Sequence, residues 1–244
     1  MNVQPTGPVD ATVVAFRPIR SGNAFEDCVE RVLSAVKLGL VPAGAQLPPE
    51  RALAARLGVS RVTLRDALHS LTAAGWLEVR RGRHGGTFVR DLVPARSGPP
   101  ARRRAIPATD IEDTLILRQV LELGAVEVAA GASLTADAER AVLTALEECR
   151  SSQPDRYRTA DSRLHLAITE LTGSAALTAA AADVRTQVNN LLDAIPLLER
   201  NIAHSNDQHD RIVHAIRRGH PGAARAAMAE HLAGTAALLH GFLS

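Results

Sequence analysis

Aromatic residues are scarce in this chain of 244 residues. They make up 2% of it, with one tryptophan, one tyrosine and four phenylalanines. Alanine and leucine dominate the 46% of residues that are hydrophobic. A composition rich in strong helix formers and poor in aromatic side chains favours helices packed on helices over a large β-sheet. At roughly 100–200 residues per domain, the length predicts one or two domains.

Long hydrophobic runs and cysteine clusters are also missing. No stretch approaches the roughly 18 apolar residues of a membrane span, which argues against a membrane protein. The first 20 residues lack the basic start and apolar middle of a secretory signal. The two cysteines, Cys28 and Cys149, lie far apart without a CxxC partner. We therefore expect buried free thiols and a cytoplasmic location.

The net charge of +2 conceals a marked asymmetry. Residues 1–106 hold 16 basic and 8 acidic residues, a balance of +8, whereas residues 107–244 hold 12 and 18, a balance of −6. A basic N-terminal half suggests a polyanionic partner, although a solvated basic surface has the same composition.

Proline- and glycine-containing stretches without hydrophobic periodicity divide the chain into four parts. Residues 1–22 resemble a loose tail, residues 23–93 a first domain, residues 94–107 an arginine- and proline-rich linker, and residues 108–244 a second domain. The first domain shows helical patterns over 25–40, 50–57 and 60–75, then strands over 76–80 and 86–90 that form a hairpin. The second predicts six helices over 110–131, 136–150, 155–172, 175–200, 202–219 and 221–242, with Pro196 kinking or ending the fourth.

The stretch GVSRVTLRDAL, residues 58–68, raises a functional question. Ser60 can cap its helix, and the apolar spacing predicts a buried face of Leu64, Ala67, Leu68 and Leu71. Arg65, Val62 and His69 then lie on the opposite face, with Arg61 at its edge. Two helices, a short turn and a basic hairpin in this order predict a winged helix-turn-helix, whose second helix enters the major groove by its N-terminal end.

The segment LPPERALAARLGVSRVTLRDALHSLTAAGWLEVRRGRHGGTFV resembles the DNA-binding domain of GntR-family transcription regulators. The resemblance implies that basic residues of the helices and wing contact bases or phosphates, while hydroxyl groups anchor the backbone. It also implies a dimer on a near-palindromic operator of double-stranded DNA, most often as a repressor released by an effector. The residues to which it assigns DNA contacts are Arg51, Ser60, Arg61, Thr63, Arg65, Arg81, Gly82 and Arg83.

The second domain has four polar residues on apolar helix faces. Asp161 and His165 are four residues apart, and His209 and His231 each lie on the apolar stripe of a later helix. Buried polar groups need partners. Hydrogen-bonded core histidines would satisfy this need, and so would a divalent metal, since imidazole suits zinc and nickel and carboxylate also suits manganese. The other helical histidines, at positions 204, 214, 220 and 240, are expected to be structural or solvated.

An all-helical second domain of this length resembles the FCD effector-binding bundle of the FadR-type group. That resemblance implies a metal, with zinc first and nickel or manganese as alternatives, held by Asp161, His165, His209 and His231. It also implies a small carboxylate effector, with Arg118 facing the pocket. The alternative for Arg118 is a simple ion pair with Glu122, four residues further along its helix.

Three functions follow from these features. The first is a transcription regulator that responds to a small carboxylate, and the second is a regulator whose signal is the metal itself. The third is a metal-dependent hydrolase, because a metal held by three histidines and an aspartate can activate water. The sequence shows no general base beside these residues, and a hydrolase would leave the first domain unexplained. We therefore expect a regulator and not an enzyme.

Overall fold

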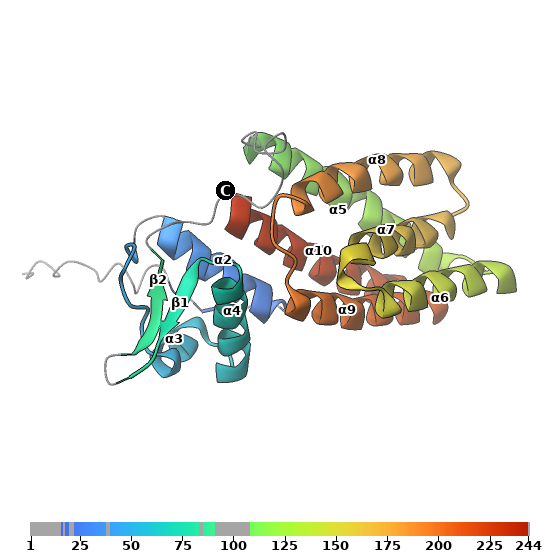
Figure 1. The fold of residues 1–244 in the computed structure, drawn as a ribbon. Coiled ribbons are helices and arrows are strands. Elements are labelled where there is room, and N and C mark those ends of the chain that lie inside the picture. The colour runs from blue at the N-terminus through green and yellow to red at the C-terminus, as the bar shows by residue number, and fades with distance from the viewer. Residues whose placement is uncertain are drawn as a thin grey trace, which may run out of the picture. The chain divides into compact units, whose positions relative to one another are not determined.

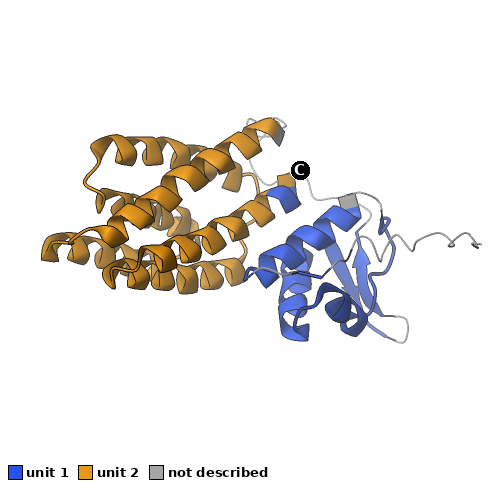
Figure 2. Ribbon diagram, turned by 180° about the vertical axis from the view of Figure 1, so that it is seen from behind, with its two compact units in different colours: residues 1–95, 240–242 blue, residues 96–239, 243–244 orange. Residues whose placement is uncertain are grey.

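A computed structural model describes residues 16, 18–19, 22–37, 40–82, 85–90 and 108–243. The described chain is mostly helical, with one small β-hairpin. It divides into two compact units, residues 1–95 with 240–242 and residues 96–239 with 243–244 (Figure 2). The expected tail at 1–22 lies mostly outside the described residues, and the expected linker at 94–107 lies entirely outside them.

The first unit is built from three helices and a hairpin (Figure 1). They are α2 (Ala24–Lys37), α3 (Glu50–Leu57), α4 (Arg61–Ala73), β1 (Leu77–Arg80) and β2 (Gly86–Val89). Gly58 ends α3 with a φ of 70°, a left-handed conformation that costs glycine little. Ser60 then caps α4, as predicted, by accepting a hydrogen bond from the Thr63 amide at 3.0 Å.

The hairpin pairs β1 and β2 in antiparallel register, with Leu77 opposite Val89 and Arg80 opposite Gly86. The loop before α3 is tied to it, because Gln46 forms a bridge with Phe88 and donates a side-chain hydrogen bond to the Gly85 carbonyl at 3.0 Å. This hairpin is the predicted wing, and α3 with α4 is the predicted helix-turn-helix. The fold of the first domain is therefore confirmed as a winged helix-turn-helix.

The second unit is all helical, as expected, with helices packed around one apolar core (Figure 1). Val126, Leu164 and Ile212 are fully buried in that core. Consecutive helices are joined by short connections, most of which contain glycine or proline. The helices are α5 (Ala108–Gly131), α6 (Ala136–Ser151), α7 (Pro154–Glu170), α8 (Ala175–Leu192), α9 (Glu199–Arg217) and α10 (Pro221–Leu243).

The expected end of the fourth helix was wrong. The pattern predicted a helix over 175–200 with a kink or end at Pro196, but α8 ends at Leu192 and α9 begins at Glu199. Proline disfavours the helical conformation of the residue before it, so a helix tends to stop ahead of one. The connecting residues 193–198 still bury Ile195 and Leu198, which explains why the apolar pattern continued through them.

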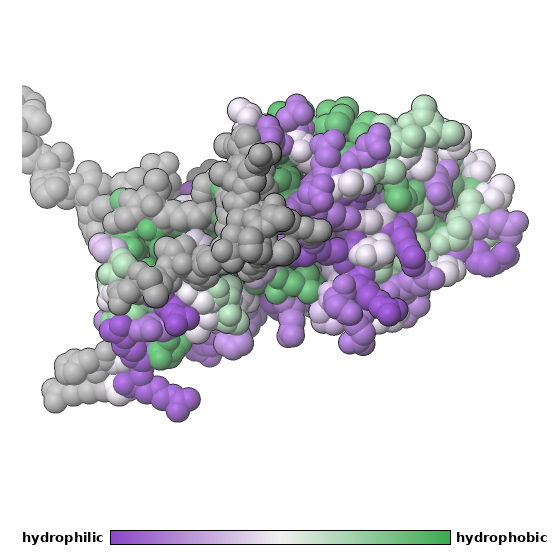
Figure 3. Space-filling view, turned by 45° about the horizontal axis from the view of Figure 1, so that its top comes forward, coloured by the Kyte–Doolittle hydropathy of each residue, from purple (hydrophilic) through white to green (hydrophobic). Residues whose placement is uncertain are grey.

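The surface of the described helices carries polar and apolar residues side by side (Figure 3). No helix among the described residues is long and apolar enough to cross a membrane. Four of the exposed large apolar residues belong to α5, namely Ile116, Leu117, Val120 and Val128.

Candidate functional sites: the recognition helix and a buried histidine cluster

Helix α4 presents the expected face to solvent. Leu64, Ala67, Leu68 and Leu71 are buried, as the apolar spacing predicted. The exposed side chains of the helix include Arg61, Val62, Arg65 and His69. The N-terminal half of α4 therefore offers two guanidinium groups to a partner.

The hydroxyl groups at the start of α4 are engaged with each other. The Ser60 and Thr63 side-chain oxygens lie 2.8 Å apart, in addition to the cap formed with the Thr63 amide. This arrangement holds the N-terminus of the helix in place, where free amides favour a phosphate. Arg51 is also exposed, one residue after the start of α3.

The structure describes part of the basic tip that was expected for the wing. Arg81 and Gly82 are exposed, whereas Arg83 lies outside the described residues. The strand before them is braced by Arg80, whose guanidinium lies over the Phe88 ring at 4.2 Å and pairs with Glu78. Cation–π stacking of this kind fixes the strand that leads into the tip.

Arg65 is held by a residue that the sequence analysis did not single out. Its Nε and Nη2 atoms donate to Oε2 of Glu50 at 3.2 and 3.0 Å, from the first turn of α3. Fifteen residues separate the two, so no helical spacing could have indicated the contact.

In the second unit, the structure brings Asp161, His165, His209 and His231 together. They come from α7, α9 and α10, and all four are buried. One ligand atom from each lies within 4.8 Å of the others. The Nε2 atoms of His209 and His165 lie 3.3 and 3.8 Å from Oδ1 of Asp161.

A second set of side chains holds the Nδ1 atoms of the three histidines. Nδ1 of His165 lies 2.6 Å from Oε2 of Glu122, and Nδ1 of His231 lies 3.1 Å from Oε1 of Gln208. Nδ1 of His209 faces the Cys149 sulfur at 3.9 Å, a long and weak contact. Carboxylate and amide oxygens only accept, so at His165 and His231 the Nδ1 atom carries the proton.

Burial disfavours the charged form of two cluster histidines, His209 and His231. Burial lowers the pKa of His209 to about 3 and moves the pKa of His231 well below its ordinary value. For Asp161, burial raises the pKa, but the neighbouring groups, Arg185 first among them, outweigh it and leave the carboxyl pKa lowered. The pKa of Glu122 is also lowered, because His165 and Arg118 outweigh the effect of burial.

These protonation states test whether a cation fits the cluster. At His231, where Nδ1 carries the proton and burial disfavours the charged ring, Nε2 offers only a lone pair. All three Nε2 atoms are buried and have no hydrogen-bond partner among the described residues, although those of His165 and His209 approach Oδ1 of Asp161. Arg185 pairs with Oδ2 of Asp161 and leaves Oδ1 directed at the histidines. Acceptors that converge without a donor fit a divalent cation.

Arg118 forms the expected ion pair with Glu122 and also lines a small cavity. Its Nε donates to Oε1 of Glu122 at 3.1 Å, but the pair is buried rather than exposed. Its Nη1 atom is buried and has no hydrogen-bond partner among the described residues. A cavity of about 50 Å³ lies beside Arg118, Asp161 and His231 and is lined on its other sides largely by apolar residues such as Leu198. A small ligand in it could therefore reach both Arg118 and the histidine cluster.

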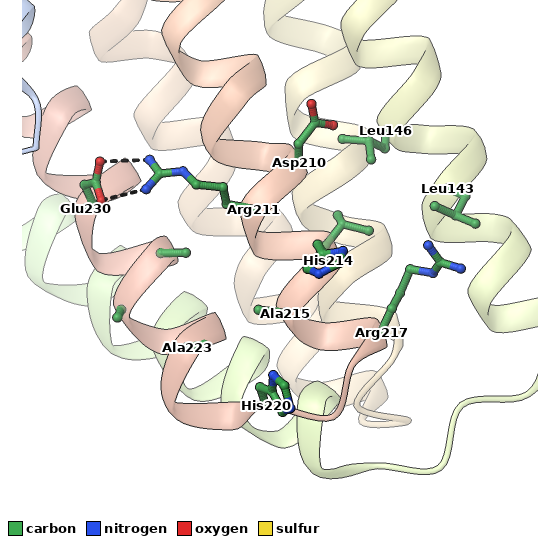
Figure 4. Close-up of a pocket in the computed structure, with 13 residues that line it drawn as sticks. Leu143, Leu146, Asp210, Arg211, His214, Ala215, Arg217, His220, Ala223 and Glu230 are labelled. Carbon is green, nitrogen blue, oxygen red and sulfur yellow. Dashed lines mark hydrogen bonds and ion pairs between the residues drawn. The ribbon is translucent and has the colours of Figure 1, made fainter.

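A larger groove of about 780 Å³ lies elsewhere in the second unit, between α6, α9 and α10 (Figure 4). It is lined by the Arg211–Glu230 ion pair and by His214 and His220, the histidines expected to be structural or solvated. No residue of the buried histidine cluster lines it. Its size alone does not make it the binding site, because two of the four cluster residues, Asp161 and His231, line the smaller cavity instead.

Comparison with known proteins finds a family match for each of the two units. Residues 26–89 match the model of bacterial regulatory proteins of the GntR family, and residues 113–234 match the FCD domain. A protein of Escherichia coli (strain K12), named as a regulator of the L-lactate dehydrogenase operon, is 32% identical over 85% of this chain and 83% of its own length. The HTH-type transcriptional regulator LutR of Bacillus subtilis (strain 168) is 29% identical over 85% of this chain and 97% of its own.

A solved structure titled Streptococcus agalactiae GntR is 25% identical and covers 87% of this chain and 98% of its own, with a TM-score of 0.46. The matching families and relatives are transcription regulators and not enzymes, which sets the hydrolase hypothesis aside. With a basic winged helix-turn-helix in front of an all-helical FCD domain, the chain belongs to the GntR family of DNA-binding transcription regulators.

Proposed function

We propose that the chain is a homodimeric repressor of the FadR-type group. In this proposal a small carboxylate binds beside a divalent metal in the FCD domain and releases the protein from a near-palindromic operator. The observation that carries the proposal is the buried convergence of Asp161 with three unpartnered histidine Nε2 atoms.

Asp161, His165, His209 and His231 would hold the metal, with zinc first and nickel or manganese as alternatives. Glu122 and Gln208 support this role, because each fixes the ring of one histidine through its Nδ1 atom. When bound, the ion supplies a Lewis acid to which a carboxylate oxygen can bind.

Charge favours an anion as the effector. Four charged side chains are buried around the site. The two positive charges of the guanidinium groups cancel the two negative charges of the carboxylates, and the residues are Arg118, Arg185, Asp161 and Glu122. A divalent ion leaves two positive charges in excess, which an anionic ligand offsets. The unpartnered Nη1 of Arg118 supplies a charged donor for the same anion.

Size restricts the effector to a small molecule. The cavity beside Arg118 measures about 50 Å³ and admits little more than a compact carboxylate. Since one relative is named for the L-lactate dehydrogenase operon, L-lactate is the first compound to try.

The same site also supports a second candidate function, in which the bound metal alone is the signal. Release of DNA from the metal-loaded protein on addition of a carboxylate would distinguish the first function from the second.

On the DNA side, the proposal assigns base contacts to Arg61 and Arg65, and backbone contacts to Ser60 and Thr63. Arg51, which is exposed near the start of α3, contacts a base or a phosphate. The wing residues 81–83 reach the minor groove.

A homodimer is supported by the exposed apolar side chains of α5. Leu117, Val120 and Val128 fall on one helical stripe with Gly124, where a Cβ atom would meet nothing within 4 Å. A stripe of this kind, with a glycine in the middle, suits close packing against a second helix. A dimer in turn matches a two-fold symmetric operator.

The test begins with the metal content of the purified, untagged protein by mass spectrometry. We expect about one ion per chain in the wild type and in His214→Ala, and little in His209→Ala, with operator binding of the metal-free protein largely intact. L-lactate and related carboxylates are then titrated onto the metal-loaded protein–DNA complex. No metal in any form, even after zinc, nickel and manganese are supplied, overturns the metal site. DNA release by metal alone favours the second candidate.

A further inference from the structure

The pair formed by Glu50 and Arg65 lies on the exposed side of the helix-turn-helix. Glu50 belongs to the first turn of α3 and Arg65 to the second turn of α4. Their side chains are 36% and 61% exposed, and Nε and Nη2 of Arg65 both donate to Oε2 of Glu50. An exposed ion pair contributes little to stability, so its geometry matters more here than its strength.

The pair uses one edge of the guanidinium and leaves the other free. Arginine has five N–H donors in a planar fork, and Glu50 takes the one on Nε and one on Nη2. The remaining donors on Nη1 and Nη2 form the end of the fork. This end is the edge that matches the O6 and N7 acceptors of guanine. Glu50 therefore fixes the rotation of the guanidinium while leaving its base-reading edge available.

Glu50 also keeps an acceptor of its own. Oε1 of Glu50 accepts no hydrogen bond among the described residues. A carboxylate oxygen in the major groove accepts from the N4 amino group of cytosine. In helix-turn-helix proteins the helix before the recognition helix crosses the DNA backbone, so a carboxylate at the start of α3 would be repelled by phosphates unless it were neutralised. Arg65 neutralises it.

We propose that Glu50 is a specificity-determining residue that acts with Arg65 to select a G·C pair. Arg65 binds guanine through its free edge, and Glu50 orients it and accepts from a cytosine amino group. The same carboxylate cancels the charge of Arg65 and thereby prevents it from strengthening binding to arbitrary phosphates. This inference rests on the proposed DNA contact of Arg65.

Two effects of Glu50→Gln follow, and they have opposite signs. Discrimination at the base pair read by Arg65 falls by about tenfold, because the guanidinium loses its fixed orientation. Affinity for unrelated DNA rises, because the freed guanidinium of Arg65 reaches a phosphate. A plot of the logarithm of this affinity against the logarithm of salt concentration then becomes steeper by about 0.9. A variant that had lost its fold or its general affinity for DNA would instead show lower discrimination together with lower affinity for unrelated DNA.

The experiment uses the full-length chain and a randomised duplex library. The wild type, Glu50→Gln, Arg65→Ala and the double variant are each allowed to bind the library, and bound duplexes are sequenced to give the preference at every position. Salt dependence is then measured on one unrelated duplex. Glu139→Gln is the matched control, because Glu139 forms a similarly exposed pair with Arg217 in the second unit.

We expect Glu50→Gln and Arg65→Ala to relax the same G·C position, and the double variant to add little further loss there. An unchanged preference in Glu50→Gln, or relaxation at a different position from Arg65→Ala, overturns the role of Glu50. If the wild type selects no motif, or if Arg65→Ala leaves its motif unchanged, the proposed DNA contact of Arg65 fails instead. Circular dichroism of each variant confirms that it is folded.

Discussion

Nδ1 of His165 on α7 lies 2.6 Å from Oε2 of Glu122 on α5, and both side chains are almost completely buried. The contact fixes the orientation of the His165 ring, which packs beside the rings of His209 and His231. Glu122 contacts Arg118 through its other oxygen. One carboxylate thus connects the predicted metal ligands with the predicted effector-binding arginine.

Replacing Glu122 with Gln should weaken metal binding by about 10–100-fold, because the histidine loses its charged partner. The measurement is a competition titration of the purified protein against a chelator of known zinc affinity. Glu127→Gln is the control, since Glu127 lies on the same helix but pairs with Arg225 at the surface. Equal zinc affinity in both variants would show that the His165 contact does not support the site.

Arg118→Lys should separate effector binding from metal binding. Lysine retains the positive charge beside Glu122 but removes the unpartnered Nη1 donor. Loss of a hydrogen bond to a charged group costs about 1.5–3 kcal/mol, so affinity for the carboxylate should fall by at least tenfold while the metal content stays the same. Isothermal titration with L-lactate on the metal-loaded protein measures this. Arg225→Lys, at an exposed arginine, should bind as the wild type does.

Much of this arrangement was predictable, because burial follows helical periodicity. The buried face of α4 and the inward direction of Asp161, His165, His209 and His231 both follow from residues three and four apart. Periodicity tells which side of a helix faces the core, and it does so for each helix separately.

The partners of those residues were not predictable in the same way. Glu122 lies 43 residues from His165, and Gln208 lies 23 residues from His231. Glu50 lies 15 residues from Arg65 and on another helix. Such contacts depend on how two helices pack and on side-chain rotamers, which no spacing within one helix specifies. The spacing of four residues between Arg118 and Glu122 indicated their ion pair, but nothing in that spacing indicated the second contact of Glu122 with His165.

Val120→Asp should weaken the proposed dimer. Val120 is 66% exposed on the apolar stripe of α5, where a carboxylate is tolerated in the monomer but would be buried without a partner in a dimer. Sedimentation velocity should show a shift towards monomer, and operator affinity should fall with it. Ala141→Asp places the same charge on an exposed position of α6 and serves as the control. Identical sedimentation of the two variants would exclude this face of α5 as the interface.

Acid should destabilise the metal-free protein between pH 7 and pH 5. Burial lowers the pKa of His209 to about 3 from an ordinary value of 6.5 and lowers that of His231 in the same direction. Below pH 6.5 the unfolded chain therefore binds protons that the folded chain does not, and the free energy of unfolding decreases as the pH falls. Each histidine contributes up to about 1.4 kcal/mol per pH unit in this range. The lowered pKa of Asp161 acts only below its ordinary value of 3.8, outside the window.

Urea unfolding in the presence of a chelator, followed by far-ultraviolet circular dichroism, measures this slope. His209→Gln should reduce the slope by up to about 1.4 kcal/mol per pH unit. Saturating zinc should stabilise the wild type most at neutral pH, because protons compete with the metal for the same nitrogen atoms. A slope that is the same in the wild type and in His209→Gln would mean that His209 is already solvated in the metal-free protein, and the cluster would then form only when the metal binds.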